Sequence, residues 1–114
     1  MDRFKFRAWN LELKRYEYGI QNGCSFGIYL NHHIVEQCTG LKDKNGKLIY
    51  EGDILKCVHS NIMKYKIYWG RSCWRMKVYG TNNKIVDDAH LFLDTAILEA
   101  IGNIHENADL LGEE

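Results

Sequence analysis

The 114-residue sequence contains no proline, no internal repeat and no change of composition of the kind that marks a linker. We therefore expect one domain over residues 1–114, a length close to the commonest domain size. No apolar run approaches the roughly 18 residues of a membrane-spanning helix, and the start MDRFKFRAW lacks the apolar stretch of a signal peptide. The sequence accordingly predicts a cytoplasmic protein.

Residues that commonly bind metals or carry catalysis are few and unfavourably spaced. The four cysteines form no Cys-x-x-Cys pair, which argues against a zinc ribbon or a redox pair and favours buried thiols. His32 and His33 would point to opposite faces of a strand, and the other three histidines are isolated. Asp43, Glu51 and Asp53 could converge on a metal, but aspartate is also a common turn residue, and we favour that structural role.

Familiar catalytic motifs are also missing. The sequence has neither Gly-x-Ser-x-Gly nor His-Glu-x-x-His, and it has no glycine-rich phosphate-binding loop. We therefore predict no metal, no cofactor and no catalytic residue, and hence not an enzyme. A catalytic site assembled from distant residues would leave no such trace.

Charge is balanced overall but unevenly distributed along the chain. The sequence has 15 basic and 15 acidic residues, yet residues 1–80 carry +7 and residues 81–114 carry −7. Such a split is typical of three situations: an acidic segment that folds back on basic strands, a nucleic-acid surface, or a surface for a partner. We favour the first, with ion pairs to the acidic third and with Ile101, Ile104, Leu110 and Leu111 anchoring the end of the chain.

Period-two alternation and turn residues predict a mainly β fold, a small β-barrel (SH3-like or related) built from hairpins with a short C-terminal helix. Strands are predicted over residues 3–9, 16–20, 24–30, 34–38, 54–58, 63–69, 73–79, 85–86 and 100–104. Residues 88–98 have mixed helix and loop character, with Asp88 as a helix cap, and Asn107 caps the final helix.

Two hairpins are specified more closely. Asn45-Gly46 is a strong hairpin signal, and we expect positive φ at one or both residues. Glu51-Gly52-Asp53 forms a second turn soon afterwards. A two-residue loop at Arg71-Ser72 would set Trp69 opposite Trp74 on one face of the next hairpin and Lys66 opposite Lys77 on the other.

Three segments, KFRAW, TGLKDKNGKLIYEGDILK and IGNIHENADLL, resemble in this order and spacing the YopX family of bacteriophage and prophage proteins. Leu48 and Ala108 depart from the family pattern, where an acidic residue and a proline are usual. The resemblance implies a mostly β, small-barrel fold and phage origin, and it implies no known reaction, cofactor or catalytic residue. The family-motif positions, which we interpret as structural, are Thr39, Gly40, Asp43, Asn45, Gly46, Tyr50, Gly52, Asp53, Gly102, Asn103 and Asn107.

Two functions from different classes remain. The first is a phage-encoded, non-enzymatic accessory or protein-interaction module, whose partner is a host protein, a phage protein or a second copy of the chain. The second is a small barrel that binds single-stranded nucleic acid through basic strand faces with interleaved aromatic residues. The candidate surface for nucleic acid or a partner comprises Arg3, Lys5, Arg7, Trp9, Lys64, Lys66, Arg75 and Lys77. Solvated strand faces would carry the same lysines, and a sequence pI near 7.0 is low for a nucleic-acid-binding domain.

Overall fold

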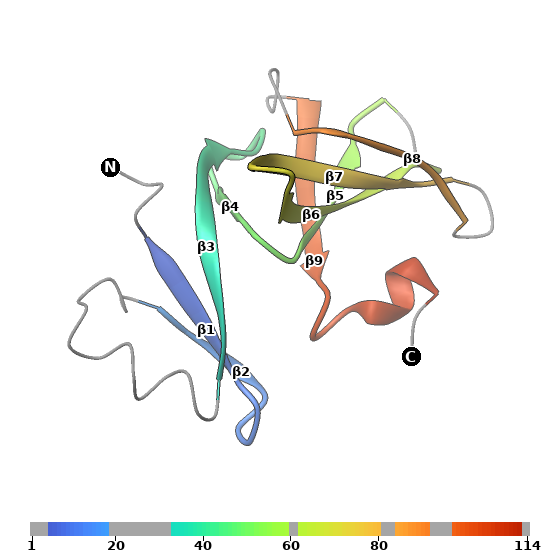
Figure 1. Ribbon diagram of the computed structural model, residues 1–114. Helices are drawn as coiled ribbons and strands as arrows, with labels where there is room; N and C mark the ends of the chain where they lie inside the picture. The colour runs from blue at the N-terminus through green and yellow to red at the C-terminus, as the bar shows by residue number, and fades with distance from the viewer. Residues whose placement is uncertain (1–4, 19–32, 60–61, 81–83, 92–96, 113–114) are drawn as a thin grey trace.

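The computed structural model describes residues 5–18, 33–59, 62–80, 84–91 and 97–112. These parts of the chain form two antiparallel sheets, which confirms the predicted mainly β fold class (Figure 1). The first sheet runs in the order β2 (Arg15–Tyr18), β1 (Phe6–Asn10), β3 (His33–Lys42) and β4 (Leu48–Tyr50). The second runs in the order β8 (Ile85–His90), β7 (Cys73–Tyr79), β6 (Lys64–Gly70), β5 (Asp53–Cys57) and β9 (Leu98–Asn103).

The second sheet curls into a half-barrel (Figure 1). Its inner face holds the larger apolar core. Alternation along the strands turns Leu55 and Ile67 inward, where they meet Ile49 from the first sheet. These three side chains are essentially inaccessible to solvent. Burying a large aliphatic side chain contributes about 1.5–3 kcal/mol, so this core accounts for much of the attachment between the sheets.

A smaller apolar cluster lies on the outer face of the half-barrel, under the end of the chain. A single turn of 3₁₀ helix, η5 (Ala108–Leu111), places Leu111 against Ile54 and Tyr79. The partly buried residues around this cluster are Ile101, Ile104 and Leu110. The anchoring predicted for the C-terminal segment is therefore confirmed, although the helix is 3₁₀ and Asn107 provides no side-chain cap to it.

The prediction for the first strand is wrong about exposure. Arg7, Ala8 and Trp9 are all buried, with 3%, 0% and 5% of their surfaces exposed. β1 lies between β2 and β3, and the face that carries Arg7 and Trp9 is turned toward the second sheet instead of solvent. Both faces of β1 are therefore buried at these positions, so the alternation of side chains does not distinguish a buried face from an exposed one.

Predictions for three other segments have different outcomes. Asp88 is not a helix cap but lies within β8, which is longer than the two residues expected. The strand predicted over 24–30 lies outside the described residues. The Arg71-Ser72 loop and its register are confirmed, with Trp69 opposite Trp74 and Lys66 opposite Lys77.

Two turns show how local chemistry shapes the sheets. Gly46 has φ of 80°, as expected for the Asn45-Gly46 tip, and its N–H donates to the carbonyl of Asp43 at 3.0 Å. Gly52, with φ of 86°, redirects the chain from β4 in the first sheet to β5 in the second. Both positions therefore use the left-handed backbone conformation that glycine adopts without strain.

Candidate functional site

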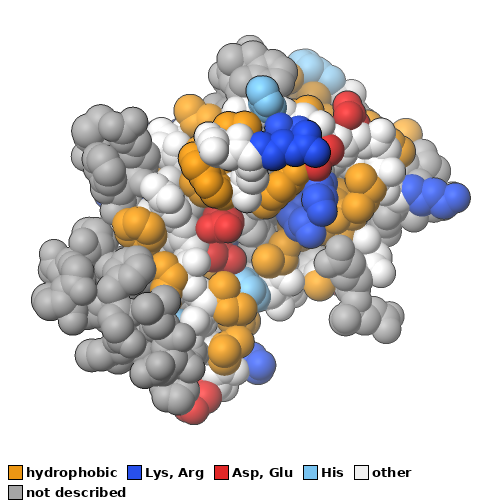
Figure 2. Space-filling model, viewed as in Figure 1, with side chains coloured by type: hydrophobic (Ala, Val, Ile, Leu, Met, Phe, Trp, Pro, Cys, Tyr) orange, Lys and Arg blue, Asp and Glu red, His pale blue; other side chains and the backbone are white. Residues whose placement is uncertain are grey.

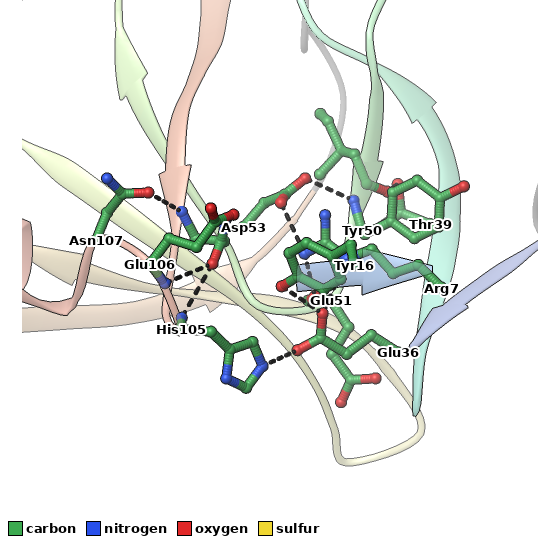
Figure 3. A network of polar contacts seen from close by, with 12 residues as sticks. Arg7, Tyr16, Glu36, Thr39, Tyr50, Glu51, Asp53, His105, Glu106 and Asn107 are labelled. Atoms are coloured by element: carbon green, nitrogen blue, oxygen red, sulfur yellow. Dashed lines mark hydrogen bonds and ion pairs between the residues drawn. The ribbon is translucent and has the colours of Figure 1, made fainter. Parts of the chain in front are cut away.

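A buried polar network joins the two sheets, and Arg7 of β1 lies at its centre (Figure 3). Its Nε lies 2.9 Å from Glu36 Oε1, and its Nη2 lies 2.9 Å from Asp53 Oδ1. The same Nη2 donates to the backbone carbonyl of Glu51 at 3.1 Å. Burial alone would lower the pKa of Arg7, but the Asp53 and Glu36 carboxylates outweigh it and raise that pKa, so the guanidinium is permanently charged.

Aromatic rings enclose the guanidinium. Its central carbon lies 4.0 Å from the ring centroid of Tyr16 and 4.8 Å from that of Tyr50. A cation between two ring faces gains a cation–π attraction that is largest where water is excluded. Arg7 is therefore held by both its charge and its flat shape, a combination that lysine could not reproduce.

Glu36 of β3 is the second centre of the network, and it connects three elements (Figure 3). One of its oxygens accepts from Arg7 and from the Tyr16 hydroxyl, both at 2.9 Å, and the other lies 3.0 Å from His105 Nε2. His105, in the turn after β9, also stacks on Trp9 with ring centroids 4.8 Å apart. Burial raises the pKa of Tyr16 far above its usual value, so its hydroxyl remains a donor to Glu36.

Strand register and one glycine make this arrangement fit. Arg7 and Glu36 are directly opposite in the β1–β3 pair, so their side chains lie on the same face of the sheet. A Cβ at Gly52 would lie 2.6 Å from Glu36 Oε2, which means that the turn between the sheets must lack a side chain there. The backbone N–H of Tyr50 donates to Asp53 Oδ2 at 2.8 Å and fixes the remaining carboxylate oxygen.

The chemistry of the network favours a structural role. Glu36 and Asp53 are each only 2% exposed, and their carboxylate oxygens are engaged by partners within the protein. Burial raises the pKa of Asp53, an effect that Arg7 opposes. A fully satisfied buried network fixes one relative placement of its elements, since any displacement leaves a charge unpaired. We therefore interpret these residues as a joint between the sheets.

A second link between the sheets comes from Asp43, at the end of β3. Its Oδ1 accepts from the N–H groups of Asn45 and Lys47, both at 2.9 Å, while its Oδ2 accepts from the N–H of Ala100 on β9 at 3.0 Å. Burial would raise the pKa of Asp43, but these three backbone donors outweigh it and lower the pKa. Asp43 thus shapes its own turn and fastens it to the edge of the half-barrel.

The other family-motif positions also serve backbone geometry. The Thr39 hydroxyl donates to the carbonyl of Ile49 at 2.8 Å, and Gly40 has φ of 85°. Asn103 Oδ1 accepts from two N–H groups in the turn that carries His105, and Asn107 Oδ1 accepts from the N–H of Asn103. A Cβ at Gly102 would lie 2.5 Å from that Asn107 oxygen. The motif therefore builds the turns around the joint.

The structure separates the candidate basic surface into two parts. Arg7 and Trp9 are corrected to interior positions, Lys5 is exposed, and Arg3 lies outside the described residues. Because Lys66 lies opposite Lys77 and Tyr68 opposite Arg75, the second group is brought together on the outer face of β6 and β7. Figure 2 shows basic side chains gathered over these two strands.

The acidic third folds back onto basic strands of the same chain, as predicted. Arg75 Nε lies 2.9 Å from Asp88 Oδ1, and Glu99 Oε1 lies 3.8 Å from both Lys44 Nζ and Lys56 Nζ. The two lysine pairs with Glu99 are exposed and contribute only about 0–1 kcal/mol each, whereas Arg75 is largely buried in its pair with Asp88. The lysine pairs therefore add little to the stability that the joint provides.

Glu36, Tyr16 and His105 are the members of the joint that sequence reasoning missed. The available signal was Glu36 itself, an acidic residue within the otherwise extended IVEQC segment. Across the described ranges, no three metal-binding side chains come together. Helices in the same ranges are all too short or too polar to cross a membrane.

The fold places the chain in the class of mainly β proteins, and in this chain an internal ion-pair network fixes a small sheet to a half-barrel. The chain belongs to the YopX family, because the family model described as "YopX protein" matches residues 20–112. The structure is also similar to protein EF1440 from Enterococcus faecalis, with a TM-score of 0.62 and 24% sequence identity over 94% of this chain and 96% of that one. That likeness shows the fold alone. Comparison with curated proteins gives no match.

Proposed function

We propose that this protein is a phage-encoded, non-enzymatic accessory protein that acts by binding another protein in the host cytoplasm. Membership of the YopX family supports the phage origin. The observation that carries the binding role is the tip of the β6–β7 hairpin, where the Trp69 side chain is left 53% exposed. Tryptophan is enriched at protein–protein interfaces and among their binding hot spots, so an exposed one at a hairpin tip supports a binding role.

The tip is also shaped by a packed aromatic pair and by its backbone conformation. Trp69 packs edge-on against Trp74, with ring centroids 5.1 Å apart. Between them Arg71 and Ser72 adopt left-handed φ values of 53° and 63°, which are strained for residues with side chains. Such strain is concentrated at functional sites, and Trp and Arg are the residue types that dominate binding hot spots. The tip therefore presents an aromatic anchor beside an exposed cation.

Affinity capture from phage-infected host cells tests this role, with three forms of the protein as bait. Trp69→Ser removes the anchor, whereas Ile85→Ser removes an equally exposed apolar side chain, 56% against 53%, at the other end of the half-barrel. We expect a partner that the wild type and Ile85→Ser both retain and Trp69→Ser loses. Purified partner should then bind Trp69→Ser about 30-fold more weakly, the effect of losing one hot-spot residue.

Equal capture by Trp69→Ser and wild type, or loss from both variants alike, would rule out the hairpin tip as the binding site. Thermal unfolding of each bait provides the folding control. Light scattering at low and high salt belongs to the same experiment, because a mass that falls with salt would identify a second copy of the chain as the partner.

Single-stranded nucleic acid is the second candidate ligand, and one specific observation favours it. Lys66 and Lys77 lie directly opposite each other on the outer face, an arrangement that costs stability unless an anion or solvent screens it. Tyr68 lies on the same face. A labelled oligothymidylate should bind with an affinity that falls with salt, and each of Lys66→Gln and Lys77→Gln should reduce the slope of log K against log[salt] by about 0.7. An affinity for the oligonucleotide that does not change with salt concentration would exclude this ligand.

A further inference from the structure

Two side chains on the outer face of the half-barrel contact a carboxylate of the same chain, and a third side chain lies opposite it in the sheet. Arg75 Nε lies 2.9 Å from Asp88 Oδ1, and Arg75 Nη2 donates to the backbone carbonyl of Asp88 at 3.2 Å. The Tyr68 hydroxyl donates to the other carboxylate oxygen, Oδ2. Lys77 lies directly opposite Asp88 in the β7–β8 pair. The Asp88 carboxylate is thus held as an external anion would be held.

The donors also have contacts that do not involve the Asp88 carboxylate. Arg75 is only 8% exposed, and its Nε also lies 3.3 Å from the Tyr68 hydroxyl. A Cβ at Gly70 would lie 2.9 Å from Tyr68 Cε2 and 3.6 Å from Arg75 Cδ, so the absence of a side chain there makes room for both groups. Lys77 Nζ lies 5.4 Å from the Tyr68 ring centroid. These contacts leave a preformed set of donors whenever the carboxylate departs.

Asp88 is the member of the group that faces solvent, with 43% of its side chain exposed. Hydrogen bonding from Tyr68, followed by the contact with Arg75, lowers the pKa of Asp88, so its carboxylate is charged at neutral pH. Arg75 and Lys77, together with Lys66 opposite Lys77 on β6, carry three positive charges against the one negative charge of Asp88. The surface therefore still attracts anions while the carboxylate is bound.

We propose that Arg75, Tyr68 and Lys77 form a phosphate site that Asp88 occupies intramolecularly, and that a backbone phosphate of single-stranded nucleic acid displaces the carboxylate. Arg75 Nε and the Tyr68 hydroxyl already donate to the two carboxylate oxygens, and two phosphate oxygens can take the same positions. This inference rests on the second candidate function. It adds that Asp88, a residue of β8, competes with the nucleic acid for the site. This competition weakens binding until several phosphates engage Lys66 and Lys77 together.

Asp88→Asn tests the site, and Asp87→Asn is its matched control. Both substitutions remove one negative charge from adjacent positions of β8, but Asp87 makes no ion pair among the described residues, and an asparagine keeps the oxygen that accepts from the N–H of Asp88. The probes are inorganic tripolyphosphate, followed by calorimetry, and a labelled oligothymidylate, followed by fluorescence anisotropy. We expect Asp88→Asn to bind both about two- to five-fold more tightly than Asp87→Asn does, the effect of losing one competing ion pair.

The outcomes separate the site from the function. Tighter binding of tripolyphosphate without any binding of the oligonucleotide would support the phosphate site and reject nucleic acid as its ligand. Equal affinities of Asp88→Asn and Asp87→Asn for both probes would overturn the site. If Asp88→Asn does not fold, Arg75→Gln in the otherwise unchanged protein decides instead, because unaltered binding of tripolyphosphate to this variant contradicts the proposal.

Discussion

Replacing Glu36 by alanine should destabilise the protein by several kcal/mol, because Glu36 receives three contacts inside the joint. The substitution removes acceptors for Arg7 Nε, the Tyr16 hydroxyl and His105 Nε2. Hydrogen bonds that involve a charged group contribute about 1.5–3 kcal/mol each but are not additive. Breaking a buried ion pair by removing one partner costs about 3–5 kcal/mol. Arg7 keeps Asp53 as a partner, so we expect a loss within that range.

Urea unfolding measures this loss. Domains of ordinary stability unfold with about 5–15 kcal/mol, so Glu36→Ala should remove a large share of the total. With a slope of about 1.5 kcal/mol/M, a loss of about 4 kcal/mol moves the urea midpoint down by roughly 2–3 M. Glu36→Gln should cost about half as much, because an amide oxygen still accepts from Arg7 and Tyr16.

Glu12→Ala is the matched control for this series, since Glu12 is an exposed carboxylate in the β1–β2 turn. It should change the unfolding free energy by less than about 0.5 kcal/mol. The reasoning is refuted if Glu36→Ala and Glu12→Ala shift the midpoint equally, because the network would then contribute nothing to the attachment of the two sheets.

Four further substitutions test individual turns. Gly46→Ala should cost about 1 kcal/mol through its positive φ alone, whereas Gly52→Ala should cost clearly more, because its Cβ would also meet Glu36; equal losses in thermal melts would contradict this. Ser72→Gly should stabilise the hairpin by about 1 kcal/mol and raise the melting temperature by several degrees, and an unchanged melting temperature would argue against strain at the tip. The folded pKa of Asp43 is lowered, so its contribution is complete above about pH 4, the ordinary value, and is lost as pH falls through the lower folded pKa. Asp43→Asn should therefore reduce stability at pH 7 and flatten its decline in acid, and an unaltered acid limb would count against the capping role.

The β6–β7 hairpin shows what could be predicted from sequence. Alternation assigns Trp69 and Trp74 to one face, and only an even loop at Arg71-Ser72 aligns them, so the register follows without any tertiary information. The left-handed backbone conformation of this loop could not be predicted from its residues. Neither Arg71 nor Ser72 is typical of left-handed backbone, whereas Asn45-Gly46, the stronger signal, has positive φ at Gly46 only.

The joint could not be predicted, because its members are distant in sequence. Whether the Arg7 charge is buried or exposed depends on Glu36, 29 residues away, and on Asp53, which reaches it only after the chain has entered the second sheet. Local alternation is the same in both cases. Asp88 illustrates the same limit, because its local signal as a helix cap was overridden by pairing with β7.

The measurement that tests the account most directly is amide hydrogen exchange of the wild-type protein, alone and with its captured partner. The account predicts slower exchange at the β6–β7 tip, from Trp69 to Trp74, on binding. It predicts no change in β1 and β3, where the Arg7–Glu36 joint holds the sheets together with or without a partner. Slower amide exchange in β1 and β3, with unchanged exchange at the tip, would contradict both assignments. The partner would then bind at the joint and not at the tip.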